Sequence, residues 1–240
     1  MTYLYVISVI FFSNFIRAVF GFGNALIAMP LLAFVISPKT ATPLVAVISL
    51  TISLFMMILQ KNSIQIKSAF ELIISSLVGI PLGIYFLKGF DIKTVNIFLG
   101  IIIILFSVYN LTGIKNLFLK NKYWSYFFGI IAGILGGAYN TNGPPVVIYG
   151  VLKGWSPEEF TATLQSYFFF TGIFIVIGHV LSGNYTDEVL GYYIFSLPAV
   201  FIPMYAGIKI NKKFSSEKFR RYIYYFLIIT SFILIYNAFR

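Results

Sequence analysis

Residues 136–145 decide the fold, and they read Gly136-Gly137-Ala138-Tyr139-Asn140-Thr141-Asn142-Gly143-Pro144-Pro145. The glycines permit positive φ angles and close backbone approach, while the two prolines remove hydrogen-bond donors and stop a helix from running through. The segments on both sides are apolar enough to lie in lipid. Irregular backbone at membrane depth is tolerated only where protein buries it or where it lines a polar cavity. We therefore expect a helix break here that forms part of a functional site.

A weaker copy of this break lies upstream, at Gly21-Phe22-Gly23-Asn24-Ala25-Leu26-Ile27-Ala28-Met29-Pro30. Arg17 precedes it by about one turn and is the one basic residue that we place inside an apolar arm. An ionised group there is costly and is functional by default, which favours anion binding. The alternative is that Arg17 snorkels to an interface or holds the hairpin together through nearby carbonyls.

Composition places the whole chain in the membrane. Of its 240 residues 59% are hydrophobic and only 10% are charged, which is far from the average of soluble proteins. At roughly 20 apolar residues per span there is room for about eight segments with short loops, and for no soluble domain. The net charge of +10 reflects lysines and arginines that fall almost entirely in loops. This pattern indicates positive-inside topology in a lipid bilayer and not a nucleic-acid partner.

The order of segments repeats. Apolar segments cover about residues 3–36, 40–59, 68–87 and 94–111, and then 123–151, 158–181, 188–208 and 218–239, with the first of each set interrupted by a break. Ser37-Pro38 and Ser156-Pro157 follow the two breaks, and Pro81 has a counterpart in Pro203. We therefore predict a first membrane repeat at 1–112, a cytoplasmic connection at 113–122 and a second membrane repeat at 123–240.

The basic residues indicate how the two repeats are oriented. If each interrupted unit is a hairpin that enters and leaves on one face, either re-entrant or as two short spans, each half crosses an odd number of times. Twelve basic residues then share one face, and four, Lys39, Lys88, Lys93 and Arg240, share the other. The fold predicted is an all-α integral membrane protein with about eight or more segments in two homologous, inverted halves, each with a broken or re-entrant hairpin.

Inverted repeats with matched breaks are typical of a transporter that binds its substrate between the breaks near the midplane. Helix N-termini, glycine turns and amides favour an anion. Most of the seven acidic residues fall in loops or at helix ends, which leaves little negative charge for a cationic substrate. Gln165 either turns its amide toward the site or makes an interhelical hydrogen bond. The candidate substrate-binding residues are Arg17, Gly21, Gly23, Asn24, Gly137, Asn140, Thr141, Asn142, Gly143 and Gln165.

Three further groups leave alternatives open. Glu71 is the most nearly intramembrane carboxylate and a candidate for a coupling proton, but Lys67 four residues earlier favours a simple helix pair. His179, the only histidine, lies near an outer loop, which favours an interfacial role over a proton relay. Pro81 and Pro203 are expected to kink their helices.

An enzyme is the main rival class. Intramembrane hydrolysis needs a nucleophile with a base, paired aspartates or an HExxH metal site. The chain has one histidine, no cysteine and no buried carboxylate pair, so we expect neither catalysis nor a cofactor or metal. A passive anion channel or facilitator is the second rival. The coupling proton or cation, the direction of flux and the oligomeric state stay open.

Residues 15–32 and 136–149 resemble the two signatures of the sulfite exporter TauE/SafE family, and residues 161–165 are similar to a segment that follows the second. The resemblance implies a multi-pass permease of the inner (plasma) membrane that exports small sulfur-containing anions such as sulfite, sulfoacetate or related organosulfonates. An alternating-access exporter is therefore expected, with a carrier of a different small anion as the alternative. The sequence departs from the family pattern at Asn24, where glycine is common, and at Thr161, where arginine is often found.

Overall fold

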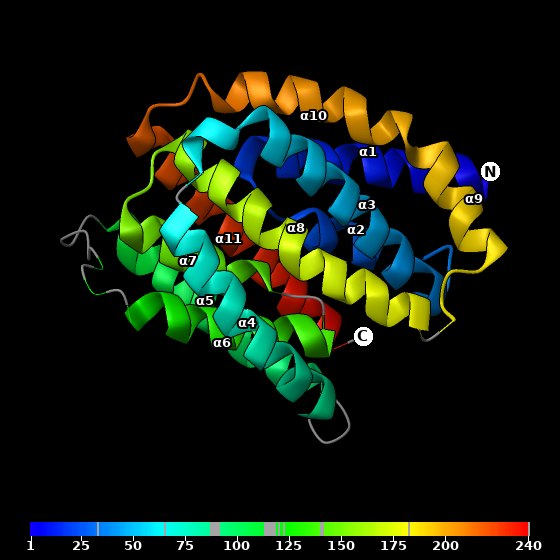
Figure 1. The fold of residues 1–240 in the computed structure, drawn as a ribbon, viewed down its shortest axis with the longest axis horizontal. Coiled ribbons are helices and arrows are strands. Elements are labelled where there is room, and N and C mark those ends of the chain that lie inside the picture. Colours follow the sequence, from blue (N-terminus) through cyan, green and yellow to red (C-terminus); the bar gives the residue numbers. More distant parts are fainter. Residues whose placement is uncertain are drawn as a thin grey trace. The chain divides into compact units, whose positions relative to one another are not determined.

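The computed structural model describes residues 1–32, 34–64, 66–86, 92–112, 119, 121, 123–139, 142–181 and 183–239. The regular elements in these ranges are helical (Figure 1). They are α1 (Thr2–Phe20), α2 (Asn24–Leu32), α3 (Pro38–Leu59), a short 3₁₀ turn (Lys61–Ser63), α4 (Ile66–Phe86), α5 (Ile92–Leu111), α6 (Tyr123–Tyr139), α7 (Gly143–Lys153), α8 (Pro157–Leu181), α9 (Asp187–Ser196), α10 (Pro198–Asn211) and α11 (Ser216–Ala238). The predicted all-α fold is confirmed.

Helix ends follow from local sequence. Ser37, Thr186 and Ser215 accept hydrogen bonds from backbone N–H groups in the first turns of α3, α9 and α11, as capping hydroxyls do. The helix α1 ends at Gly21, whose φ of 86° is left-handed. Glycine adopts this conformation without steric cost, so the first predicted break falls where the sequence placed it.

One predicted helix is divided. The segment expected at 188–208 forms α9 and α10, which meet at Leu197 with a bend of 41°. Pro203, where a kink is expected, lies inside α10, six residues beyond this bend. The break comes earlier because Pro198 has no N–H to donate to the carbonyl of Ile194, and the N–H of Leu197 bonds to that carbonyl instead.

Several helices are suited to a membrane. Within the described residues, α1, α8 and the Thr40–Leu59 part of α3 are long and apolar enough to cross a bilayer, and the bent α9–α10 pair is a fourth if it forms one span. The helices α4, α5 and α11 have 21, 20 and 23 residues, which is also spanning length. The arms that follow the breaks are short. With 9 residues α2 extends about 14 Å, against about 30 Å of hydrocarbon.

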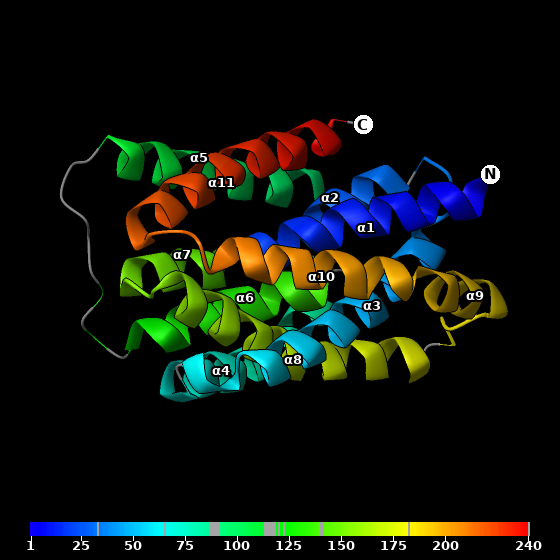
Figure 2. The ribbon, with the colours of Figure 1, turned by 90° about the horizontal axis from the view of Figure 1, so that it is seen from above.

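The chain divides into two compact units. The first unit comprises Met1–Ala69 and Glu158–Lys213, and the second comprises Phe70–Pro157 and Phe214–Arg240. Each unit therefore contains helices from both predicted repeats. In the first unit α1 lies beside α10, α2 and α9, and α3 lies beside α9 and α2; in the second α5 lies beside α11 (Figure 2).

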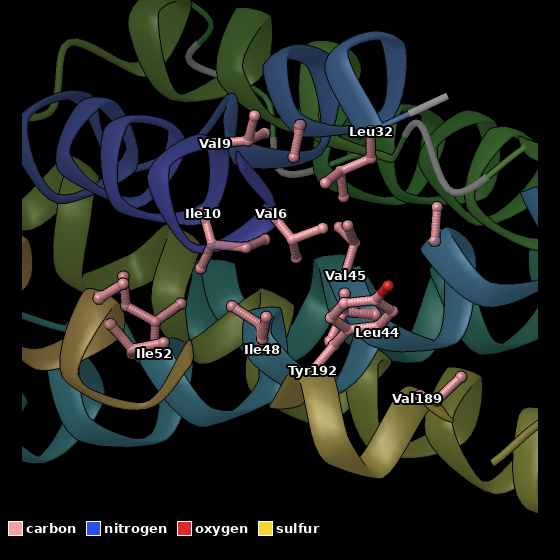
Figure 3. Close-up of a cluster of buried hydrophobic side chains, with 14 of the residues drawn as sticks. Val6, Val9, Ile10, Leu32, Leu44, Val45, Ile48, Ile52, Val189 and Tyr192 are labelled. Atoms are coloured by element: carbon pink, nitrogen blue, oxygen red, sulfur yellow. The ribbon is translucent and has the colours of Figure 1, made fainter. Parts of the chain in front are cut away.

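The core of the first unit lies between α1, α3 and α9. Val6 and Ile10 of α1 face Val45 and Ile48 of α3, and Tyr192 of α9 closes the cluster (Figure 3). Farther along α1 the packing relies on small residues. A Cβ added at Gly207 of α10 would lie 2.9 Å from the carbonyl carbon of Ala18. Small residues permit such close backbone approach between membrane helices.

The second unit contains a comparable contact between α4 and α6. A Cβ added at Gly133 would lie 2.8 Å from the Cα of Ser76, and one added at Gly79 would lie 2.9 Å from the backbone nitrogen of Ile134. The hydroxyl of Ser76 donates to the carbonyl of Gly129 across the same contact, at 2.7 Å. This small-residue seam holds α6 against α4.

Candidate functional site

Arg17 is the centre of the polar network in the first unit. Its side chain is only 2% exposed although it lies near the end of an apolar helix. The Nε and Nη2 groups both donate to Oε1 of Gln165, at 3.2 and 2.9 Å. Nη1 donates to Oδ1 of Asn24 at 3.1 Å, and Nη2 also donates to the hydroxyl of Ser53. The guanidinium is thus held by oxygens from α2, α3 and α8.

These hydrogen-bond partners are all uncharged. Among the described residues no carboxylate accepts from Arg17, and the guanidinium carbon lies 5.0 Å from the ring centroid of Phe168 in a cation–π contact. Arg17 therefore does not snorkel to an interface, and its acceptors are side chains rather than the hairpin's carbonyls. A buried charge without an opposite charge is expensive. The described residues supply hydrogen bonds for this cation but no counter-ion.

The network includes the first break itself. Gly21 and Gly23 have φ of 86° and 98°, and the N–H of Gly21 donates to the carbonyl of Arg17 at 2.6 Å. The Nε2 group of Gln165 donates to the carbonyl of Gly21 at 2.8 Å. Gln165 thus accepts from the charge with its oxygen and holds the break with its nitrogen. The sequence left open whether the amide of Gln165 faces the site or only joins two helices, and in the structure this amide contacts the first break.

Two serines complete the network on α3. Asn24 donates through Nδ2 to the hydroxyl of Ser49 at 2.7 Å, and the hydroxyl of Ser53 donates to the carbonyl of Ser49 at 2.7 Å. Neither serine was predicted from the sequence. They lie four residues apart and so share one face of α3, but two serines at this spacing in an apolar helix indicate a polar site only weakly.

Thr161 lies on the other side of the break. A Cβ added at Gly21 would lie 3.3 Å from its Cα. Asn211 of α10, which the sequence analysis also missed, donates through Nδ2 to the hydroxyl of Thr161 at 3.1 Å and to the carbonyl of Val19 at 2.8 Å. The position where the family resemblance suggests a second arginine therefore holds a buried threonine that packs on the break.

The second break lies in the second unit. The helix α6 ends at Tyr139, and α7 begins at Gly143 with Asn142 as its N-cap residue. The side chain of Asn142 is buried but makes no capping hydrogen bond. A Cβ added at Gly136 would lie 2.9 Å from the Cβ of Asn142, so the chain folds back closely at this point.

The ten candidate residues therefore divide into three groups. Those at the first break are Arg17, Gly21, Gly23, Asn24 and Gln165, and hydrogen bonds join four of them. Those of the second unit are Gly137, Asn142 and Gly143. Asn140 and Thr141 lie outside the described residues. A single site formed by both breaks stays a prediction.

Glu71 differs from its expected role. Within the described part of the chain no ion pair joins it to Lys67, which is exposed. Instead the hydroxyl of Ser125 on α6 donates to Oε2 of Glu71 at 2.5 Å. The helix-pair interpretation is wrong because the carboxylate turns into the α4–α6 contact while the lysine turns away from it.

The remaining ionisable groups supply no second centre. Nδ1 of His179 and Nδ2 of Asn184 are 3.1 Å apart, and the histidine ring packs edge-on against Tyr185. This contact at the α8–α9 loop agrees with an interfacial role. Among the described residues no group of three or more His, Cys, Asp or Glu side chains is arranged to hold a metal ion.

Comparison with known proteins identifies the family. The family model described as sulfite exporter TauE/SafE matches residues 6–234, nearly the whole chain. No curated protein and no solved structure matches.

Proposed function

Because the chain belongs to the sulfite exporter TauE/SafE family, it is a membrane transporter of sulfur-containing anions, and we propose that it binds them at the buried guanidinium of Arg17. The substrates proposed are sulfite, sulfoacetate or related organosulfonates, which leave the cell across the inner (plasma) membrane. The role proposed is that of a carrier and not of an enzyme.

The observation that carries this proposal is the uncompensated charge. Arg17 is buried among Gln165, Asn24, Ser53 and Phe168, none of which is negative. An arginine fork presents parallel N–H groups that match the oxygens of an oxyanion. A bound anion would supply both the missing charge and oxygens equivalent to those of Gln165 and Asn24.

The second break is proposed to complete the site. Gly143 begins α7 and Pro144 and Pro145 follow it without N–H groups, so the attraction of this helix N-terminus for an anion would come from the helix dipole and the N–H of Gly143. Gly137, Asn140, Thr141 and Asn142 would supply close backbone approach and further donors.

Packing supports the proposed duplication that underlies alternating access. Ala18 and Gly133 are 115 positions apart and correspond in the two repeats. Ala18 packs on Gly207 of α10 in the first unit, and Gly133 packs on Gly79 of α4 in the second. Since α4 and α10 also correspond, each broken hairpin packs on a helix of the other repeat. Inverted repeats that exchange partners in this way suit rocking around a central site.

A passive anion channel or facilitator is the second candidate, as is a carrier for a different small anion. Thr161, in place of a second arginine, favours a site with one positive charge and thus a monovalent or weakly held anion. Saturable flux and exchange of internal for external anion distinguish a carrier from a channel.

The test is the flux of radiolabelled sulfite and sulfoacetate in proteoliposomes. Arg17→Gln removes the charge and leaves a shorter neutral amide, while Lys212→Gln removes the same charge from an exposed position at the end of α10. We expect saturable flux with wild type and Lys212→Gln, and a fall of about 10- to 100-fold with Arg17→Gln, because a charge-assisted hydrogen bond contributes about 1.5–3 kcal/mol. Equal flux in the two variants contradicts the proposed site.

A further inference from the structure

Export of an anion against its concentration gradient needs an energy source. A proton gradient can supply it if the transporter holds a titratable group inside the membrane that binds the proton. The part of the chain that the structure describes contains one buried carboxylate, Glu71, which is 7% exposed. The other described acids, Glu158, Glu159, Asp187, Glu188 and Glu217, are exposed or half-buried near helix starts.

The partner of Glu71 suits a group that gains and loses a proton. Ser125 is fully buried and donates its hydroxyl proton to Oε2 of Glu71 at 2.5 Å. A lysine or arginine partner would hold the carboxylate ionised. A hydroxyl instead donates to a carboxylate and accepts from a carboxylic acid, so it serves both protonation states.

Among the described residues no charged group contacts the carboxyl of Glu71. On α4 itself Lys67 is exposed and unpaired with Glu71. On α6, the titratable neighbours of Ser125 are Tyr123 and Tyr126, which are exposed and therefore turn to other faces of the helix. The carboxyl thus has a hydroxyl on one side and no fixed counter-charge in the described residues packed against it.

The position of Glu71 links it to the second break. One turn farther along α4, Ser75 and Ser76 enter the small-residue seam, where a Cβ at Gly129 would lie 2.7 Å from the carbonyl oxygen of Leu72. Such a tight contact transmits a displacement of α4 directly to α6. The helix α6 in turn leads to the break before Asn142. A change of charge at Glu71 therefore acts on the helix that positions this break.

We propose that Glu71 is a proton-binding site that couples proton entry to anion export. A proton taken up by the carboxylate on one side is released on the other as the carrier changes state, and no bond other than O–H forms or breaks. This inference rests on the proposed anion transport and identifies the proton as the ion that drives it.

The test compares wild type, Glu71→Gln and Glu217→Gln in proteoliposomes loaded with labelled sulfoacetate, which has no group that titrates near neutral pH. Glu71→Gln imitates the protonated acid, and Glu217→Gln removes an exposed acid in the same unit. Two quantities are measured: anion exchange at equal pH on both sides, and net anion movement driven by a pH gradient.

We expect wild type and Glu217→Gln to show both activities, and Glu71→Gln to keep exchange but lose the gradient-driven movement. Gradient-driven movement in Glu71→Gln, or exchange without any response to the gradient in wild type, overturns the proposal. Absence of exchange in wild type instead refutes the anion transport on which it rests. Infrared difference spectra give an independent readout, since a protonated carboxyl band that titrates in wild type must disappear in Glu71→Gln.

Discussion

Each break separates a longer helix from a shorter one, but the two breaks differ in chemistry. At the first, Arg17, Asn24 and Gln165 satisfy one another around a buried positive charge. At the second, Asn142 makes no capping bond, and Pro144 and Pro145 follow at positions that leave α7 with few N–H donors. The first break holds the buried charge, and the second presents the N-terminus of the short helix α7.

The largest expected effect comes from placing a carboxylate at the first break. Gln165→Glu puts a negative charge at a group that now lies 2.9 Å from Nη2 of Arg17. The tethered carboxylate competes with the substrate anion. Displacing one partner of a buried ion pair costs about 3–5 kcal/mol, equivalent to a fall in affinity of about 100-fold or more. We expect anion flux to vanish, while the new ion pair offsets the loss of the Nε2 bond to Gly21, so that thermal stability changes little.

Gln165→Met is the matched control, because it keeps the volume without the charge. It should weaken the break by loss of the bond to Gly21 but retain measurable anion binding. If Gln165→Glu transports as well as wild type, Arg17 is a structural charge and the contrast between the breaks loses its functional meaning.

The next effect concerns the helix that leads to the second break. Gly133→Ala forces a methyl group against the backbone of Ser76, and overpacking of this kind costs about 1–3 kcal/mol. Gly178→Ala in α8 is the control, since its Cβ meets no atom within 4 Å. Alanine there gains up to about 1 kcal/mol of helix propensity. The unfolding temperature in detergent should therefore fall for Gly133→Ala and rise for Gly178→Ala. A shift in the same direction for both variants contradicts the tight α4–α6 seam.

Gly21→Ala measures the rigidity of the first break. A left-handed φ costs an L-residue about 1–2 kcal/mol, and the contact at 3.3 Å with Thr161 adds to this cost. Gly183→Ala carries the same kind of strain at φ 67°, but in an open position with no atom within 4 Å. Gly21→Ala should lower the unfolding temperature more. Equal shifts would mean that Thr161 does not press on the break.

The helices and the breaks were predictable because length, apolar composition, glycine and proline act locally. Partners across the fold were not. Gln165 and Ser53 meet Arg17 from 148 and 36 residues away, and several other hydroxyls in the same apolar helices were equally plausible partners. Glu71 shows the limit most plainly. The i,i+4 rule selected Lys67, but a buried hydroxyl 54 residues away bonds to the carboxylate instead.

The smallest effect on stability is expected at Asn142 in the second break, in contrast to Asn24 in the first. Asn24→Ala removes bonds to Arg17 and Ser49, and leaving buried partners unsatisfied costs about 1–3 kcal/mol each. Asn142→Ala removes a side chain with no capping bond, so the free energy of unfolding should change less than in Asn24→Ala. If Asn142 nonetheless donates to the substrate, its replacement lowers anion affinity while the unfolding temperature stays constant. That separation of binding from stability is the signature of a side chain kept for a ligand, whereas unchanged affinity would leave the first break as the only binding element.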